Sequence, residues 1–329
     1  MVRENLQCVR MGEYAVFVVN RALRYANTIP VLAIAAILLF CSPASPQNTS
    51  NDSTTSAGDF LRRAIDGELK AQADDHTHWM YRERTGASGD QVKSVVETRE
   101  GDVDRLCLVN GQAITPEQAK QEDQRIARLL RKRGEQKKRK RAQEEDARQT
   151  EHLFKMLPDA VIASYGENKG DVVEIIFKPN PDFRPSSHED AVFHAMAGRI
   201  WINRKEDRLV EIEGHLIQNV TFAGGLLGHL DKGGEFHVRQ SEVAPGRWEV
   251  TLLQVHMRGK ALFFKTIAVQ QDEIRTDFRQ VPDSLTLAQA AEELQKQSTE
   301  KSIADKMQRV PTGSLANSQT TDSKRVDRN

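Results

Sequence analysis

The sequence is poor in cysteine, carries no net charge and lacks familiar catalytic motifs, and each shortage argues against a class of protein. Only three cysteines occur among 329 residues, and Cys8 and Cys41 lie in or beside an apolar N-terminal stretch. Cys107 is then left without a partner, so we expect neither a disulfide framework nor a Cys-rich metal site. Lys and Arg balance Asp and Glu at 47 each, so no overall field draws the chain to nucleic acid.

The missing motifs are those on which common enzyme chemistry rests. His76 and His78 would share a face of a strand, but neither an HExxH motif nor a cysteine pair accompanies them. Residues 188–194 combine histidines with acids near a turn, without a GxSxG nucleophile turn or a suitably spaced cysteine. The glycines at 224–234 match no phosphate or dinucleotide loop. We therefore expect a protein that is not an enzyme and holds no metal or cofactor.

The N-terminus has the pattern of an export signal. Arg21 and Arg24 precede an uninterrupted apolar run at residues 31–40. Ten apolar residues are too few to span a bilayer comfortably, but they suit the core of a signal peptide. Small residues at 42–44 offer a cleavage site for a leader peptidase. We expect residues 1–41 to be a signal peptide that directs the chain to the periplasm or cell envelope.

Three alternatives stay open for this segment. Cys41 directly follows the apolar run, as in a bacterial lipoprotein signal, and its acylation would give a lipid-anchored form. Without cleavage, the apolar run would instead anchor the chain. The basic flank also lies far from Met1, which makes Met11 a candidate start.

Polar segments flank the part of the chain that we expect to fold. Residues 42–58 are rich in Ser, Thr, Asn and Pro and predict a flexible linker. The folded domain is expected over residues 59–283, beginning with a helix capped by Asp59. Residues 284–329 predict a short helix followed by a polar, disordered tail.

Runs of alternating residues, separated by short turns, dominate the predicted domain. The expected strands lie at 78–85, 91–100, 103–109, 160–165, 172–178, 197–203, 208–214, 235–240, 247–255 and 262–269. Period-two alternation broken by Gly, Pro or Asp turns indicates antiparallel strands joined as hairpins in a meander. One such turn is predicted at residues 258–260, and residues 221–234 are expected to be a flexible, Gly-rich connection.

A basic helical segment interrupts this pattern. Thr115 is a helix N-cap, Pro116 suits the first helical position, and the helical pattern continues to Leu157 with a possible break at Gly134. Residues 125–141 carry ten basic residues and a single acid. We expect a solvated helical hairpin or long helix that projects from the sheet and attracts anionic lipid headgroups weakly. Only apolar positions near its ends should pack on the domain, namely Ile126, Leu129, Leu130, Leu153, Phe154 and Met156.

Several predicted strands are apolar on both faces, which permits two interpretations. Trp248 and Val250 share one face of a strand, whereas Leu253 and Val255 share the other. The core between sheet and helices is then either filled, or a curved sheet leaves one apolar face as a ligand cavity. The residues expected to line such a cavity are the large apolar ones on the strands and on the flexible connection: Trp79, Trp201, Phe222, Phe236, Trp248 and Phe264.

Three loose motifs, Tyr-Arg-Glu-Arg at 81–84, Phe-Lys-Pro-Asn-Pro at 177–181 and Gly-Arg-Ile-Trp-Ile-Asn at 198–203, carry a resemblance. With the strand pattern, the region 60–282 resembles the lipoprotein-carrier fold of periplasmic lipoprotein-sorting proteins and their outer-membrane receptors. The resemblance implies an α+β fold, in which a curved antiparallel half-barrel has helices covering its concave side. Residues 115–157 would be a charged helical insertion in that fold.

The resemblance also implies a function without covalent chemistry. The chain would be an exported envelope protein that binds or carries acyl chains of lipoproteins or other lipids in the apolar cavity. The alternative is an envelope sensor or scaffold that acts through protein contacts of its charged helix. The expected partners are therefore acyl chains, an envelope protein and, weakly, anionic membranes, but not nucleic acid.

Overall fold

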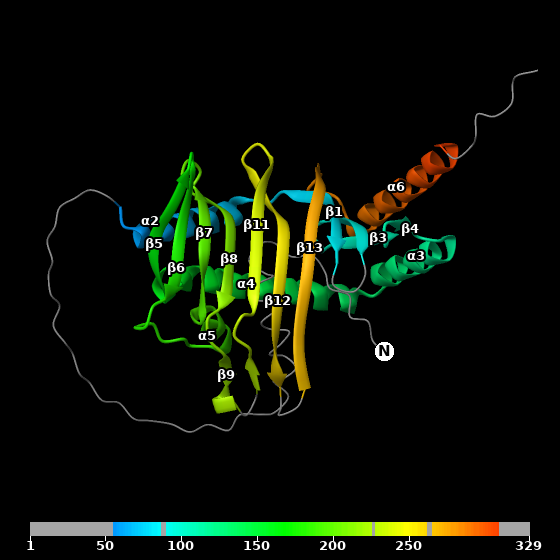
Figure 1. The fold of residues 1–329 in the computed structure, drawn as a ribbon. Helices are drawn as coiled ribbons and strands as arrows, with labels where there is room; N and C mark the ends of the chain where they lie inside the picture. The colour runs from blue at the N-terminus through cyan, green and yellow to red at the C-terminus, as the bar shows by residue number, and fades with distance from the viewer. Residues whose placement is uncertain (1–54, 87–89, 226–227, 262–264, 309–329) are drawn as a thin grey trace, which may run out of the picture.

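An open antiparallel sheet organises the computed structural model, which describes residues 55–86, 90–225, 228–261 and 265–308 (Figure 1). Its main path follows the order β4-β3-β2-β1-β13-β12-β11-β8-β7-β6-β5, and β9 and β10 extend it beside β12. The strands are β1 (His78–Thr85), β2 (Gln91–Val96), β3 (Val103–Val109), β4 (Gln112–Ala113), β5 (Val161–Lys169), β6 (Val172–Pro179), β7 (Met196–Asn203), β8 (Arg208–Leu216), β9 (Val220–Phe222), β10 (Gly228–Leu230), β11 (Glu235–Ala244), β12 (Arg247–Ala261) and β13 (Lys265–Val281). The prediction of a mixed fold with an antiparallel sheet is confirmed.

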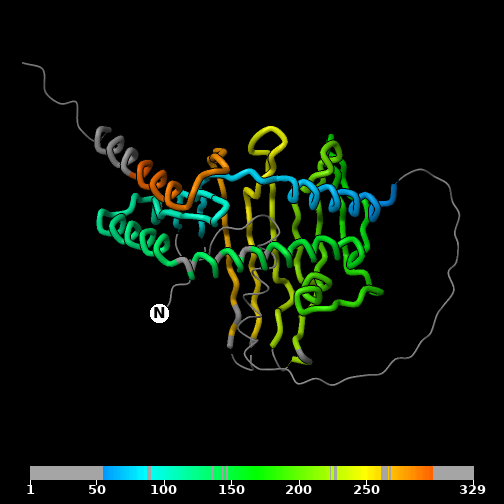
Figure 2. Tube along the Cα trace, turned by 180° about the vertical axis from the view of Figure 1, so that it is seen from behind, coloured from blue at the N-terminus to red at the C-terminus, as the bar shows by residue number. Residues whose placement is uncertain are grey.

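Helices lie on the sheet and at one end of it. They are α2 (Ala57–Asp74), α3 (Pro116–Arg131), α4 (Arg133–Ala160), α5 (His188–His194) and α6 (Leu287–Gln308). Figure 2 shows α2 and α4 crossing one face of the sheet, whereas α3 and α6 lie at the end that holds β1 to β4. No described helix is both long enough and apolar enough to cross a membrane.

Two apolar cores follow from the alternation of side chains along the strands. The larger core joins α2, α5 and the end of α4 to β5–β12, and it buries Leu61, Ile65 and Ile200 almost completely. The smaller core joins α3 and α6 to β1–β3 around Met80 and Val96. Because neighbouring residues of a strand point to opposite faces, Trp79 and Tyr81 point away from this second core.

A buried carboxylate holds α2 on the sheet. Glu68 is 0% exposed, and its oxygens accept hydrogen bonds from Arg208 Nε at 2.9 Å, Gln240 Nε2 at 3.0 Å and the Leu209 amide at 3.3 Å. Gly67, the preceding residue, has no room for a side chain, since a Cβ would lie 2.8 Å from a backbone oxygen of the β7–β8 turn. Helix and sheet therefore meet at close range.

The turn predicted at residues 258–260 is wrong. β12 continues through Gly259, which is paired with Leu230 of β10 on one side and Ile267 of β13 on the other. A Cβ on Gly259 would lie 2.1 Å from the carbonyl oxygen of His229. Glycine therefore occurs here because the backbones of two strands approach closely and leave no room for a side chain.

The Gly-rich segment 221–234 is also more ordered than expected. Residues 220–222 and 228–230 form the β9–β10 hairpin, and the short helix η1 (Ala223–Gly225) lies in its connection. β10 then pairs with the end of β12, so the hairpin belongs to the sheet. Positive φ angles at Gly224 (63°) and Gly225 (91°) explain why glycine occurs there. Residues 226–227 lie outside the described part of the chain.

The basic segment, predicted as a helical hairpin or a long helix, forms two helices. The break lies at Lys132, two residues before Gly134, where φ is −97° and ψ is 76°. α4 then continues through Pro158 to Ala160 and runs along the sheet, so the expectation that this segment projects from the sheet is wrong for α4 (Figure 2). The apolar positions predicted to pack are buried or half-buried: Ile126, Leu129, Leu130, Leu153, Phe154 and Met156.

The terminal helices of the described chain differ in their bounds from the predicted ones. Ser56 caps α2 by accepting a hydrogen bond from the Asp59 amide at 3.1 Å, so the helix begins two residues before the predicted cap. α6 extends past the predicted short helix and buries Leu287 and Leu294. The predicted signal peptide, most of the linker and residues 309–329 lie outside the described residues.

Glu68→Ala should lower the free energy of unfolding by about 3–5 kcal/mol, because it leaves the largely buried Arg208 without its carboxylate. Urea unfolding followed by circular dichroism measures the change. Asp66→Ala on the exposed side of the same helix is the matched control and should change stability by less than about 0.5 kcal/mol. A loss below about 1 kcal/mol for Glu68→Ala would contradict a positioning role.

Candidate functional site

The structure brings only two of the six predicted ligand residues into one cluster. Phe222 and Phe236 are 3% and 5% exposed in the larger core. Phe236 packs on Phe193 with ring centroids 6.2 Å apart, and Phe222 meets His188 at 5.2 Å. Both rings therefore have protein neighbours on the helix-bearing face of the sheet.

The other four residues lie elsewhere or outside the described chain. Trp79 is buried in a separate cluster with Tyr81. Trp201 is half-buried and alternates with the buried residues of β7, so it points to the face away from α2. Trp248 lies at the start of β12, where its indole N–H donates to Glu206 at 2.8 Å. Phe264 falls within residues 262–264, which the structure does not describe.

An apolar row on β12 continues the larger core. Leu253, Val255 and Met257 alternate along one face and are at most 3% exposed. Val269 of β13 is paired with Met257 and packs against the same core. Figure 2 shows that the ends of β12 and β13 extend past α4. The apolar face of the sheet therefore reaches beyond the helix that crosses it.

A buried charged cluster lies on β1 and β13. Glu83, Glu273 and Arg275 are 6%, 4% and 2% exposed. The Arg275 Nε donates to Glu273 Oε1 at 2.8 Å and lies 4.0 Å from Glu83 Oε2. Glu273 is paired with Leu253 across the strands, and Glu83 is paired with Arg275, so the cluster shares the face of the apolar row.

Aromatic side chains form one side of this cluster. The guanidinium of Arg275 lies 5.0 Å from the ring centroid of Tyr81, which stacks on Phe278 at 5.2 Å. The hydroxyl of Tyr81 and the indole N–H of Trp79 are buried without a hydrogen-bond partner among the described residues. Unpaired buried donors are costly, and they are exceptions that mark special regions of a fold.

Burial, followed by the charge of Glu273, raises the pKa of Glu83 to about 8, although Arg275 and Lys93 oppose the shift. Glu83 is therefore protonated at neutral pH and can donate a hydrogen bond, whereas Arg275 stabilises the Glu273 carboxylate. Such perturbed groups are concentrated at functional sites, which makes the cluster a candidate.

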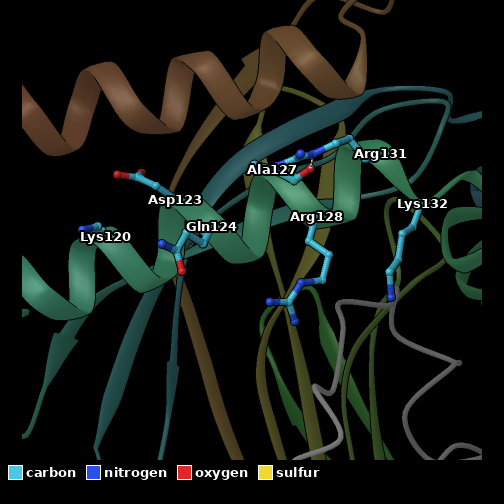
Figure 3. Close-up of a pocket in the computed structure, with 7 residues that line it drawn as sticks. All are labelled: Lys120, Asp123, Gln124, Ala127, Arg128, Arg131 and Lys132. Atoms are coloured by element: carbon cyan, nitrogen blue, oxygen red, sulfur yellow. Dashed lines mark hydrogen bonds between the residues drawn. The ribbon is translucent and has the colours of Figure 1, made fainter.

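A second candidate site is a basic pocket on α3, with a volume of about 710 Å³ (Figure 3). Its lining residues are Lys120, Asp123, Gln124, Ala127, Arg128, Arg131 and Lys132. Asp123 accepts from Arg105 at 2.7 Å, which neutralises the acid of the pocket. The basic run was visible in the sequence, and all of these lining residues lie within residues 120–132.

The histidine and acid cluster at 188–194 serves to cap a helix. The Asp190 carboxylate bonds to Ser186 and Ser187 at the start of α5 and to the His152 ring at 2.9 Å. Burial would raise the pKa of Asp190, but these hydrogen bonds lower it below its ordinary value. The carboxylate therefore stays charged and stabilises the N-terminus of the helix.

Metal and thiol chemistry find no support in the described residues. Within them, no group of three or more His, Cys, Asp or Glu side chains is arranged to hold a metal ion. Cys107 is half-buried, with its sulfur 3.3 Å from Ser94 Oγ. No family model, curated protein or solved structure matches the chain.

Glu83→Gln should change how stability depends on pH. The pKa of Glu83 is raised from 4.5 to about 8 on folding, so its contribution is fully present below pH 4.5 and is lost as pH rises to 8. We expect the wild-type free energy of unfolding to fall by a few kcal/mol between pH 5 and 8. In Glu83→Gln most of this fall should disappear, because glutamine stays neutral.

The control is Glu167→Gln, whose carboxylate is 78% exposed. It should keep the wild-type pH profile, measured by urea unfolding at several pH values. Parallel profiles for Glu83→Gln and the wild type would show that folding does not raise the pKa of Glu83.

Proposed function

We propose that the chain is an exported envelope protein that binds or carries acyl chains of lipoproteins or other lipids without covalent chemistry. The apolar face of the sheet that extends past α4 carries this proposal. In this proposal the open sheet is a half-barrel of the lipoprotein-carrier type, and α2 and α4 cover its concave side. Residues 1–41 are its export signal, and residues 115–157 are a charged insertion.

In this proposal the row of Leu253, Val255 and Met257 supplies the contact surface for a chain. These side chains are at most 3% exposed, so a chain reaches them only after a segment that covers them moves aside. Each methylene that leaves water contributes about 0.8 kcal/mol. An acyl chain with about twelve buried methylenes thus gains roughly 10 kcal/mol before the costs of binding are subtracted. Even partial burial along this face is enough to hold a lipid against water.

Release of such a ligand requires a part that moves, and the β9–β10 hairpin is suited to this role. β10 is joined to β12 by only three residue pairs, at Gly228–Leu230 and residues 259–261. Detaching it breaks few hydrogen bonds and opens the end of the sheet where the apolar row continues. In this proposal the β9–β10 hairpin is the part that moves, in place of the flexible connection expected at residues 221–234.

The second candidate function is an envelope sensor or scaffold. It is favoured by the packing of Phe222 and Phe236 against aromatic neighbours within the larger core. A filled core of this kind needs no ligand, and the charged helices then serve as the contact surface for a protein. The two functions differ in whether the purified protein carries lipid.

Protein purified without detergent should release acyl lipid into organic solvent, detected by mass spectrometry. Met257→Gln should weaken binding of a fluorescent fatty acid by roughly tenfold, because it places an amide on the apolar row. Ile274→Gln is the matched control, since Ile274 lies on the neighbouring strand and is 45% exposed. Absence of lipid together with no binding of the probe would favour the scaffold function.

A further inference from the structure

The cations of α3 fall into two groups that differ in their partners. Arg125, on the side facing the sheet, contacts both Asp104 and Glu122. Lys120 and Arg128, on the outward side, are exposed and form no ion pair among the described residues. Acids thus contact the cation that faces the sheet, whereas Glu117, an exposed acid in the first turn of α3, forms no ion pair with Lys120 or Arg128 among the described residues.

The outward cations surround the pocket of about 710 Å³. Figure 3 shows the side chains of Arg128 and Lys132 pointing away from α6. Arg131 donates to the carbonyl oxygen of Ala127 at 3.1 Å, which fixes its guanidinium on the helix surface. Because Asp123 is paired with Arg105, it does not cancel the charges of Lys120 and Arg128.

The basic surface continues from the pocket onto α4. Lys137, Lys138, Lys140 and Arg141 are exposed along its first turns. The exposed large apolar residues in the described chain lie on strands or on the loop after β8, not on α3 or α4. Contact through this surface therefore depends on charge, without insertion of side chains into an apolar phase.

The distribution of charge over the whole chain selects the partner. Lys and Arg equal Asp and Glu at 47 each, so the acids that balance this surface lie elsewhere on the molecule. A flexible polyanion that wraps around the protein would be repelled by those acids. A membrane contacts only the face turned towards it, so the acids elsewhere do not oppose its binding.

We propose that the outer surface of α3 and the first turns of α4 dock on anionic membranes, with the α3 pocket receiving phosphate headgroups. The docking stands on its own charges and does not require that the sheet binds acyl chains. If both functions hold, docking brings the apolar face to the lipid source.

The test is co-sedimentation of the full chain with phosphatidylcholine vesicles and with vesicles containing phosphatidylglycerol. Any apolar attraction of residues 31–40 acts on both vesicles, so the measured quantity is the difference between them. We expect a preference for anionic vesicles that fades at high salt. Lys120→Gln combined with Arg128→Gln should lower that preference by roughly 25-fold, since each basic residue near the surface contributes about fivefold.

The matched control is Lys169→Gln combined with Lys205→Gln, which removes the same charge from side chains that are 79% and 75% exposed on hairpin turns. It should bind as the wild type does, and circular dichroism should show both variants folded. Equal losses in the two variants, equal binding to both vesicles, or full displacement by inorganic phosphate at constant ionic strength would overturn the proposal. If protein whose organic extracts contain no lipid still co-sediments with anionic vesicles, docking is supported and the carrier function is rejected.

Discussion

The buried carboxylate of Glu68 is the contact on which the position of α2, and with it the larger core, depends. Its partners Arg208 and Gln240 lie on different strands, so the carboxylate fixes the helix both along and across the sheet. If α2 shifted by one residue along the sheet, the buried carboxylate would lose these partners, at a cost of several kcal/mol. Leu61 and Ile65 share the helix face of Glu68, and they enter the core only in this register.

Local sequence was sufficient to predict most of the sheet, because alternation and turn chemistry involve neighbouring residues. The β11–β12 turn at Gly246, whose φ is 70°, is an example. The turn predicted at Gly259 was wrong because glycine occurs both in turns and where two strands approach closely. Here the close approach is to the carbonyl oxygen of His229, which belongs to another strand. The course of α4 along the sheet was also missed, since it depends on packing with α2 and β5.

The two candidate sites differ in how far the sequence could predict them. The basic surface of α3 was visible because exposed charge is dense within one short segment. The charged cluster was not, because Glu83 and Arg275 meet only through the pairing of β1 with β13. The raised pKa of Glu83 follows first from burial, and burial is set by that long-range pairing. The sequence also could not distinguish a filled apolar core from a ligand-binding face, because both are built from the same residue types in the same pattern.

The strand order also sets the order in which the chain can fold. β1 lies between β2 and β13, so β13 joins the group β1–β4 to the group that runs from β12 to β5. Until residues 265–281 are available, these two groups have no shared strand, and each has an unpaired edge facing the gap. Such edges recruit other chains, and pairings this distant in sequence form slowly. A chain synthesised from its N-terminus therefore needs protection until its last strand has emerged.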